Sequence, residues 1–213
     1  MNELSLHDIA LERGERRIAA GISAHVPDGQ ALLLHGANGS GKSTLLRVLA
    51  GLLPPAAGRV LWNGEDVAED RETFRQRFLY LGHQDGLKPG LTALENLQFW
   101  ARYGGGHDPD GGDPGAALRA FDLTALADRP VRVLSAGQKR RVALCRLALR
   151  PVPLWLLDEP LTALDEQARE AFLTLLERHL QTGIAVIATH HAVPVDSIVL
   201  SIGKPIAGQR GAA

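Results

Sequence analysis

The sequence predicts an α/β fold, with a central parallel sheet and a small helical subdomain inserted into it. Four apolar runs are continuous rather than alternating, which is typical of strands buried on both faces. These runs are residues 31–34, 78–81, 154–157 and 184–188. From Gln84 to Ser135 the pattern is helical, with no convincing strand. We therefore expect one domain over residues 1–213, with an α/β core in 1–84 and 134–213 and the inserted helical subdomain in 85–133.

Amphipathic patterns place the predicted helices between these strands. The expected helices are 42–52, 136–149 and 165–180 in the core, and 92–103 and 116–126 in the subdomain. Asp165 is a suitable N-cap for the longest of them, and Gly183 lies where that helix would stop. Residues 104–115 are rich in glycine, and this composition predicts a flexible surface loop.

Composition excludes several classes of protein. Lys and Arg number 23 against 24 Asp and Glu, and this balance argues against a nucleic-acid-binding protein. Cys145 is the only cysteine, so no internal disulfide can form, and we expect a buried thiol. The longest apolar run is shorter than the ~18 residues that a membrane span needs. We expect a cytoplasmic chain that does not itself enter the bilayer.

A phosphate-binding loop follows the first predicted strand. Residues 36–44 match the pattern G-x-x-x-x-G-K-[ST], and a predicted helix begins directly after it. The glycines let backbone N–H groups turn toward phosphate oxygens, while the helix N-terminus adds positive potential. The expected nucleotide-binding residues are Gly36, Ala37, Asn38, Gly39, Ser40, Gly41, Lys42, Ser43 and Thr44. Lys42 would bridge the β- and γ-phosphates, and the hydroxyl of Ser43 would bind Mg²⁺.

Two adjacent carboxylates end the apolar run at 154–157. Asp158 and Glu159 would repel each other at a buried strand end unless they had a cation and a water to act on. We therefore expect Asp158 to hold Mg²⁺ and Glu159 to polarise an attacking water. Together with the phosphate loop, these carboxylates predict a P-loop nucleoside-triphosphate hydrolase that uses Mg²⁺.

A further predicted helix start carries unusual charge. Ser135 and Gln138 have the spacing of a capping box. Lys139, Arg140 and Arg141 follow in the first turn, where positive charge opposes the helix dipole by about 0.3–1 kcal/mol each. An anion bound at this helix end would relieve the conflict, so the segment predicts a second phosphate-facing helix terminus.

Residues 135–138, Ser-Ala-Gly-Gln, resemble the signature motif of ATP-binding cassette (ABC) ATPases. The other cassette motifs occur in the family's order over roughly residues 3–203. They are the phosphate loop, Gln84, the signature, Asp158–Glu159, Leu164–Asp165 and His190. The resemblance implies a P-loop fold with an ABC-type core sheet, and a head-to-tail dimer of two copies that encloses two ATP molecules.

The same resemblance assigns roles to residues outside the phosphate loop. It implies that Ser135, Gly137 and Gln138 contact the γ-phosphate bound by the other copy. Gln84 would sense Mg²⁺ and the attacking water, and it would couple them to the helical subdomain. His190 would contact the γ-phosphate, whereas the neighbouring His191 is the less suitable candidate. The implied catalytic residues are Glu159, His190 and Gln84, and the implied metal ligands are Ser43, Gln84 and Asp158.

Residues 82–97 resemble the haem-exporter ATPase of bacterial cytochrome c maturation, as does the short chain without a regulatory domain after His190. This resemblance implies integral membrane subunits as partners and a peripheral place on the cytoplasmic face of the bacterial inner membrane. The implied output is haem export or release of a haem-loaded chaperone. The alternatives are the ATPase of another small exporter, a soluble cassette acting as a mechanical switch, and a P-loop kinase.

One feature departs from the cassette pattern. Cassette ATPases often stack an aromatic residue from the N-terminal strands on adenine, but this chain has no Phe, Tyr or Trp before Trp62. The corresponding region is 13–17, where an arginine could stack on the base by a cation–π contact. We therefore expect weak selectivity for the base.

Overall fold

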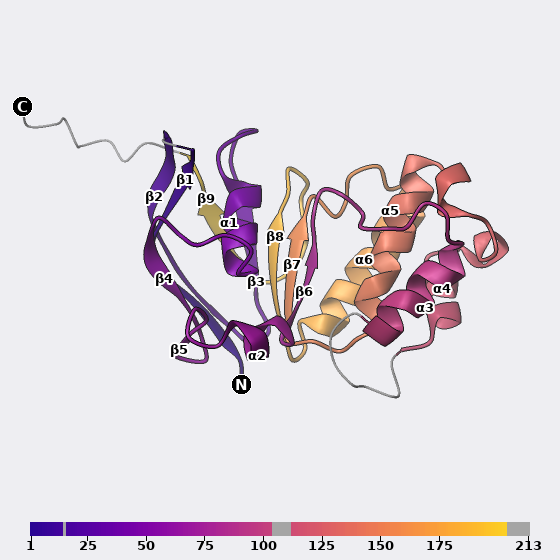
Figure 1. The fold of residues 1–213 in the computed structure, drawn as a ribbon, viewed down its shortest axis with the longest axis horizontal. Helices are drawn as coiled ribbons and strands as arrows, with labels where there is room; N and C mark the ends of the chain where they lie inside the picture. The colour runs from indigo at the N-terminus through magenta and orange to yellow at the C-terminus, as the bar shows by residue number, and fades with distance from the viewer. Residues whose placement is uncertain (15, 104–111, 204–213) are drawn as a thin grey trace, which may run out of the picture.

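The computed structural model describes residues 1–14, 16–103 and 112–203, which form two sheets with helices between and beside them (Figure 1). The parallel sheet has the strand order β6-β7-β8-β3-β9. Its strands are β3 (Ala31–His35), β6 (Phe78–Leu81), β7 (Leu154–Asp158), β8 (Ile184–Ala188) and β9 (Ser197–Ser201). The four predicted strands are confirmed, and β9 adds an edge strand that the sequence analysis did not predict.

The second sheet is antiparallel, with the strand order β2-β1-β4-β5, and it was also not predicted. Its strands are β1 (Glu3–Arg13), β2 (Arg16–Pro27), β4 (Ala57–Trp62) and β5 (Glu65–Asp66). The apolar pattern of β1 is interrupted because the register shifts between Leu6 and Ile9, where Asp8 adopts a left-handed φ of 48°. Such a bulge changes which face each side chain takes, and this obscures strict alternation.

Two apolar cores lie on the two faces of the parallel sheet. Helix α1 (Lys42–Leu49) packs between the two sheets, as Figure 1 shows, and its leucines join one core. Successive residues of β7 alternate between the cores: Leu154 and Leu156 face α1, whereas Trp155 and Leu157 face the other helices. Burial on both faces explains why these strands have continuous apolar sequences.

Helix α2 (Arg71–Arg75) contributes Phe74 to the same core as α1, and the other helices cover the opposite face of the parallel sheet and extend away from it (Figure 1). They are α3 (Ala93–Tyr103), α4 (Pro114–Ala120), η1 (Thr124–Leu126), η2 (Val131–Val133), α5 (Ala136–Cys145), η3 (Arg146–Ala148) and α6 (Glu166–His179). Asp165 caps α6 as predicted, since its carboxylate accepts the N–H of Ala168 at 2.9 Å. The glycine-rich loop predicted for 104–115 lies mostly outside the described residues, and the division into core and inserted subdomain stays a prediction.

Several predicted helices are shorter or divided. Helix α1 ends at Leu49 rather than at residue 52, and the predicted helix 136–149 changes to a 3₁₀ turn after Cys145. The predicted helix 116–126 begins at Pro114 and splits into α4 and η1. Pattern alone locates a helix better than it locates its ends, because the last turn of many helices tightens to 3₁₀ geometry.

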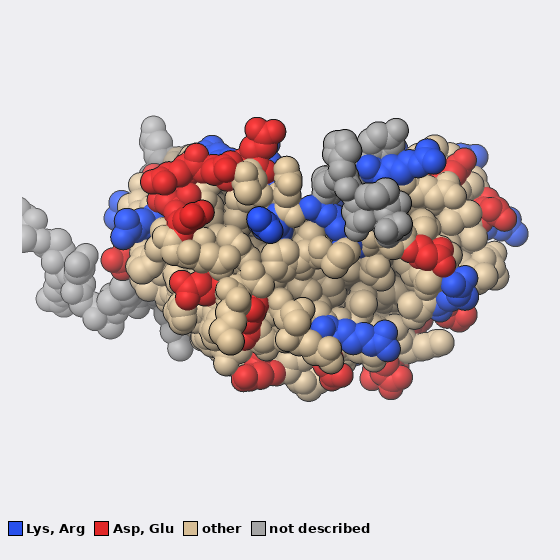
Figure 2. All heavy atoms as spheres, turned by 90° about the horizontal axis from the view of Figure 1, so that it is seen from below, with Lys and Arg blue, Asp and Glu red and all other residues tan. Residues whose placement is uncertain are grey.

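Acidic residues gather on one part of the surface. Figure 2 shows Asp and Glu side chains over the region of β5 and of α2 (Arg71–Arg75), where the sequence carries Glu65, Asp66, Glu69, Asp70 and Glu72. Hydrogen bonds from Thr73 lower the pKa of Asp70, the N-cap of α2. Negative charge at this helix end is favourable because the helix dipole is positive there.

The buried cysteine is confirmed. Cys145 is fully buried, and burial raises the pKa of its thiol, so it is not a reactive nucleophile at neutral pH. The rings of Trp155 and His179 stack 3.8 Å apart at an interplanar angle of 5°. Within the described residues, no helix is long and apolar enough to span a membrane.

Candidate functional site

The phosphate loop joins β3 to α1, and its backbone accepts only glycine at two positions. A Cβ on Gly36 would lie 2.5 Å from the carbonyl oxygen of Ile202 and 2.5 Å from Oγ of Ser40. Gly41 has a φ of 108°, a conformation that other residues rarely adopt. These two glycines let the loop turn tightly beside β9 and lead directly into the helix.

The N-terminus of α1 lacks a side-chain cap at its N-cap position. The N-cap residue is Gly41, which has no side chain to accept a hydrogen bond from the first turn, and that turn contains no acidic residue. The first N–H groups of a helix need acceptors, and the helix dipole makes this end attractive to anions. The sequence therefore leaves an open anion-binding position between Gly41 and Lys42.

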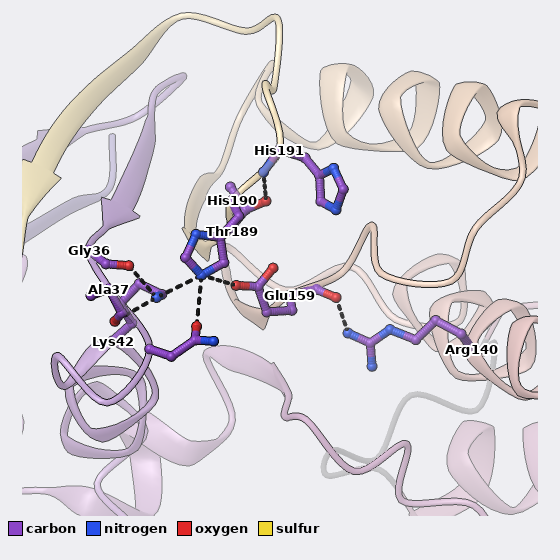
Figure 3. A network of polar contacts seen from close by, with 9 residues as sticks. Gly36, Ala37, Lys42, Arg140, Glu159, Thr189, His190 and His191 are labelled. Atoms are coloured by element: carbon purple, nitrogen blue, oxygen red, sulfur yellow. Dashed lines mark hydrogen bonds and ion pairs between the residues drawn. The ribbon is translucent and has the colours of Figure 1, made fainter.

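The side chain of Lys42 is buried and lies along the phosphate loop. Its Nζ donates to the carbonyl oxygens of Gly36 at 2.7 Å and Ala37 at 3.3 Å, and it lies 3.2 Å from Nε2 of His190 (Figure 3). Only 8% of the residue is exposed. A buried ammonium group held by neutral partners lacks a compensating anion, which a phosphate would supply.

The two carboxylates lie at the carboxyl end of β7, as predicted. Asp158 is 3% exposed and pairs with Ala188 across the parallel sheet. Glu159 follows with a left-handed φ of 49°, and its Oε1 lies 3.6 Å from Nε2 of His190 (Figure 3). Non-glycine residues in this backbone region are strained by about 1–3 kcal/mol, and such strain concentrates at functional sites.

His190 connects the phosphate loop with Glu159. Its Nε2 lies 3.1 Å from Oδ1 of Asn38, in addition to its contacts with Lys42 and Glu159. This nitrogen accepts a hydrogen bond from Lys42 only without a proton, and it donates to Glu159 only with one. The ring can therefore respond to charge placed between the lysine and the glutamate. The neighbouring His191 points elsewhere, and its N–H donates to Oγ1 of Thr189.

A cavity of about 510 Å³ brings these elements together. Residues 38–44 of the phosphate loop line it, together with Asp158 and Glu159. Six further lining residues are Glu12, Arg13, Ile18, Arg47, Leu53 and His83. Of these residues, Arg13 lies in the region 13–17 expected near the base, and His83 lies in the segment 82–97 that carries the family resemblance. The others belong to no recognisable motif, and they reach the cavity from the unpredicted β1–β2 hairpin, from α1 and from the segment after it.

Several predicted site residues do not line this cavity. Gly36, Ala37 and His190 contact Lys42 but are not part of the cavity wall, and Gln84 and the signature residues also lie outside it. Gln84 is exposed after β6, and it is the neighbouring His83 that reaches the cavity wall. Ser135 and Gln138 instead satisfy each other as the predicted capping box: the Ser135 N–H donates to Oε1 of Gln138 at 2.9 Å, and the Gln138 N–H donates to Oγ of Ser135 at 3.2 Å. Gly137 lies against the backbone of Ala163, whose carbonyl oxygen would be 2.8 Å from an added Cβ.

The charge argument made for the start of α5 is wrong for Arg140. Its side chain is 6% exposed and points into the protein, where it donates to backbone carbonyl oxygens and to Asp85. Arg141 donates to the carbonyl oxygen of Phe121 and lies 3.9 Å from a carboxylate oxygen of Asp165. The protein's own acceptors thus compensate these charges, and no bound anion is needed to explain them.

The donor atoms at the cavity suit Mg²⁺. Ser43 and Asp158 supply a hydroxyl and a carboxylate oxygen on the wall of one cavity, and Mg²⁺ prefers oxygen ligands. No group of three or more His, Cys, Asp and Glu that could hold a metal occurs in the part of the chain that the structure describes. A site with one or two protein ligands fits Mg²⁺, which usually completes its shell with water and substrate phosphates.

Comparison with known families agrees with this geometry. Residues 19–162 match the family described as ABC transporter. The chain therefore belongs to the ABC transporter family, and it is an ATP-binding, ATP-hydrolysing subunit with the fold of that family. A solved ATP-binding subunit of an ABC transporter superposes with a TM-score of 0.79 and 26% identity, over 93% of this chain and 87% of that one.

The curated relatives of the chain include ATP-binding export proteins of cytochrome c biogenesis. The chain is 46% identical to the "Cytochrome c biogenesis ATP-binding export protein CcmA 2" of Cupriavidus metallidurans, over 93% of this chain and 94% of the relative. It is 50% identical to a CcmA protein of Paramagnetospirillum magneticum, over 88% and 87%. An ATP-binding cassette solved as a dimer with ADP and phosphate shares the fold, with a TM-score of 0.76 and 24% identity over 94% of this chain and 97% of that one.

Proposed function

We propose that the chain is the ATPase subunit of a membrane complex that exports haem, or releases a haem-loaded chaperone, during cytochrome c maturation. The catalytic part of this proposal rests on one observation: Nε2 of His190 contacts both Lys42 and Glu159, which lie at one cavity. The names of the relatives, which describe ATP-binding export proteins of cytochrome c biogenesis, support the biological part.

The phosphate loop would bind the β- and γ-phosphates of ATP. Lys42 already lies along the loop, and the open N-terminus of α1 offers backbone N–H donors. Oγ of Ser40 is buried and has no hydrogen-bond partner among the described residues, so it can pair with a phosphate oxygen. The proposed binding residues remain 36–44, from Gly36 to Thr44.

Ser43 and Asp158 would hold Mg²⁺, with Gln84 as the proposed third contact. When bound, the ion neutralises charge on the phosphate oxygens. Gln84 is exposed and lies outside the cavity wall in the structure, so its side chain would have to turn toward the ion. The neighbouring His83 does line the wall.

Glu159 would act on the attacking water. The water oxygen forms a bond to the γ-phosphorus, the bond from that phosphorus to the leaving oxygen of ADP breaks, and Glu159 accepts a proton of the water. His190 would donate to the γ-phosphate, for which its Nε2 must carry a proton. That requirement favours breaking its contact with Lys42, because an ammonium group cannot accept a hydrogen bond.

A second copy would complete the reaction centre. Ser135, Gly137 and Gln138 lie away from the cavity of their own chain, and Ser135 is exposed. In a head-to-tail dimer, the start of α5 in one copy would meet the γ-phosphate bound by the other. We further propose integral membrane subunits as partners and a peripheral location on the cytoplasmic face of the bacterial inner membrane.

The experiment that tests the biological role is deletion of the gene in its native host, followed by a haem stain for c-type cytochromes. We expect these bands to disappear and to return with the wild-type gene or with Arg119→Gln, a change in an exposed ion pair on α4. Lys42→Ala should not restore them. Intact cytochrome bands in the deletion strain would contradict the haem role and favour another exporter.

The ATPase activity needs a separate test on the purified chain. We expect free phosphate as the product, dependent on Mg²⁺ and lost in Lys42→Ala. A phosphorylated small molecule in place of free phosphate would identify a kinase instead. Normal activity in a chain that never associates with membranes would favour the soluble switch.

A further inference from the structure

The side chain of Arg140 joins three segments that are distant in the sequence. Its Nη1 donates to the carbonyl oxygen of Gly82 at 3.3 Å and to Oδ1 of Asp85 at 3.0 Å. Its Nη2 donates to the carbonyl oxygens of Asp158 at 2.7 Å and Glu159 at 2.8 Å, the latter contact visible in Figure 3. A single buried guanidinium group thus links α5 to the segment after β6 and to the end of β7.

The contact with Glu159 bears on catalysis because the backbone of Glu159 is strained. Its φ of 49° is left-handed, and the surrounding structure must hold it there. The N–H of Glu159 donates to the carbonyl oxygen of Ala188 at 2.8 Å, while its own carbonyl oxygen accepts from Arg140. These two bonds fix both backbone groups of the residue, and so they set the direction of its carboxylate toward His190.

A second arginine holds the same segment from the other side. Arg146 donates to the carbonyl oxygen of Asp85 at 3.4 Å, and its guanidinium carbon lies 3.6 Å from the ring centroid of Trp100 on α3. Burial lowers the pKa of Arg146 to about 10, so it stays charged at neutral pH. Asp85 is therefore held through its carboxylate by Arg140 and through its backbone by Arg146.

The segment that begins at Gly82 is also fastened to α3. Asn96, 1% exposed on that helix, accepts the N–H of Lys88 at 2.7 Å, and its amide donates to the carbonyl oxygens of Lys88 and Thr92. A chain of contacts therefore runs from Glu159 through Arg140 and Asp85 to α3. Gln84, the proposed sensor of the nucleotide, lies within this fastened segment.

Apolar side chains could fill the space occupied by Arg140 and Arg146 without the desolvation cost of buried charges. Nε of Arg140 and Nε of Arg146 are both buried without a hydrogen-bond partner among the described residues. A buried ion pair contributes little net stability, because desolvation offsets the attraction between the charges. Its presence between the end of β7 and α3 points to a role beyond holding the fold together.

We propose that Arg140 is a positioning residue for ATP hydrolysis, and that its pair with Asp85 makes the carboxylate of Glu159 and helix α3 move as one unit. This proposal rests on the proposed function, because Glu159 needs positioning only if the chain hydrolyses ATP. Arg140 touches no substrate; it acts through the backbone of Glu159.

The test is a double-mutant cycle on the purified full-length chain, measuring kcat and KM for ATP together with the thermal midpoint. Arg140→Gln should lower kcat about tenfold or more while KM stays within about twofold, because binding by the phosphate loop is unaffected. Asp85→Asn should lower kcat in the same direction. The double variant should be no slower than Arg140→Gln, since both changes remove the same pair.

Two further variants separate positioning from folding. Arg140→Lys keeps the charge but cannot reach both pairs of acceptors, so it should recover only part of kcat. Arg119→Gln on α4, which removes an exposed ion pair with Asp113, should leave kcat at the wild-type value. If Arg140 only stabilised the fold, kcat would not be expected to fall in Arg140→Gln and to recover partly in Arg140→Lys.

Three outcomes would overturn the proposal. The first is wild-type kcat in Arg140→Gln with only a lower thermal midpoint, and the second is an additive loss in the double variant. Should Arg140→Gln fail to fold, wild-type kcat in Asp85→Asn is the third. Failure of the proposed function looks different, because the wild type would then release no phosphate or Glu159→Gln would keep full activity.

Discussion

Two helix N-termini that we assign to the same chemistry are built in opposite ways. Helix α1 begins at Gly41 with no side-chain cap and no acidic residue in its first turn. Helix α5 begins at Ser135 with a complete capping box, in which Ser135 and Gln138 satisfy each other's backbone N–H groups. The first helix end lies at the cavity and the second lies away from it.

The difference teaches how a binding site can be divided between two copies of one chain. An open helix end binds phosphate without first losing an internal contact, whereas a capped end is stable in the absence of ligand. We infer that α1 binds the nucleotide first and that α5 of the other copy adds its contacts when the dimer closes. Changes at helix ends and at the cavity should separate their contributions to activity and stability, from the largest expected effect to the smallest.

The largest effect should come from the open helix end and the carboxylate beside it. Lys42→Ala should abolish turnover and weaken ATP binding, because its ammonium group lies along the phosphate loop at the start of α1. Glu159→Gln should lower kcat by about 100-fold or more and leave ATP binding intact. Phosphate release and equilibrium ATP binding measure the two effects separately. Full activity in Glu159→Gln would contradict its assigned role.

At the C-terminus of α6, burial rather than a ligand determines the charge of a side chain, the imidazole of His179. His179 lies in the last turn, where the dipole favours a cation, yet burial lowers its pKa to about 4. The unfolded chain binds a proton near pH 6.5 and the folded chain does not. Stability is therefore fully present above pH 6.5 and falls as the pH drops toward 4, by up to roughly 3 kcal/mol.

Denaturant unfolding at several pH values measures this loss. His179→Phe keeps a ring against Trp155 but cannot titrate, so its free energy of unfolding should fall less between pH 6.5 and 4.5. The variant should start from a lower stability, because the hydrogen bond to the carbonyl oxygen of Ile184 is lost. Identical slopes in the two proteins would show that His179 does not control this pH dependence.

A smaller effect on stability, with a clear effect on activity, is expected at the capped helix end. Ser135→Ala should destabilise the chain by about 1 kcal/mol, because the cap of α5 is lost. Ser135→Asn should keep the cap and still lose ATPase activity. The change removes the hydroxyl of Ser135, which is proposed to contact the γ-phosphate bound by the other copy. Asp70→Ala at the N-cap of α2 is the matched control, with a similar loss of stability and normal activity. Wild-type kcat in Ser135→Asn would limit Ser135 to capping.

The smallest effect should be the preference between bases. No Phe, Tyr or Trp occurs among the described residues that line the cavity, and Arg13, Ile18 and Leu53 form part of its wall instead. These side chains offer a cation and apolar surface, but no built hydrogen-bond pattern for one purine is apparent from their types. We expect GTP to support turnover within about tenfold of ATP. A much larger preference for ATP in kcat/KM would contradict this expectation.

Sequence patterns located the catalytic half of the fold well. The strands of the parallel sheet are buried on both faces, so their continuous apolar runs were easy to identify. The phosphate loop and the Asp158–Glu159 pair are local in sequence, and the structure brings both to one cavity. Because parallel strands end at the same edge of the sheet, their placement followed from the order of the motifs.

The rest depends on contacts between distant residues, which no local pattern records. The antiparallel sheet was missed because a bulge at Asp8 and charged residues on its exposed face break the alternation of β1. The inward direction of Arg140 was missed because the helix dipole argument considers one helix alone, whereas its acceptors lie after β6 and β7. The roles of Gln84, Ser135 and Gly137 stay predictions, since Gln84 would act only after its side chain turns and the other two only with a second copy.

The most direct measurement mixes two inactive variants. Lys42→Ala keeps an intact start of α5, and Ser135→Arg keeps an intact phosphate loop, so a mixed head-to-tail dimer would contain one complete site. If the copies exchange freely and the sites act independently, about half of the dimers in an equal mixture are mixed, and each of these has one of its two sites complete. The mixture should therefore recover about a quarter of the wild-type phosphate release. Activity that stays at the level of the separate variants, despite proven subunit exchange, would contradict a reaction centre shared between two copies.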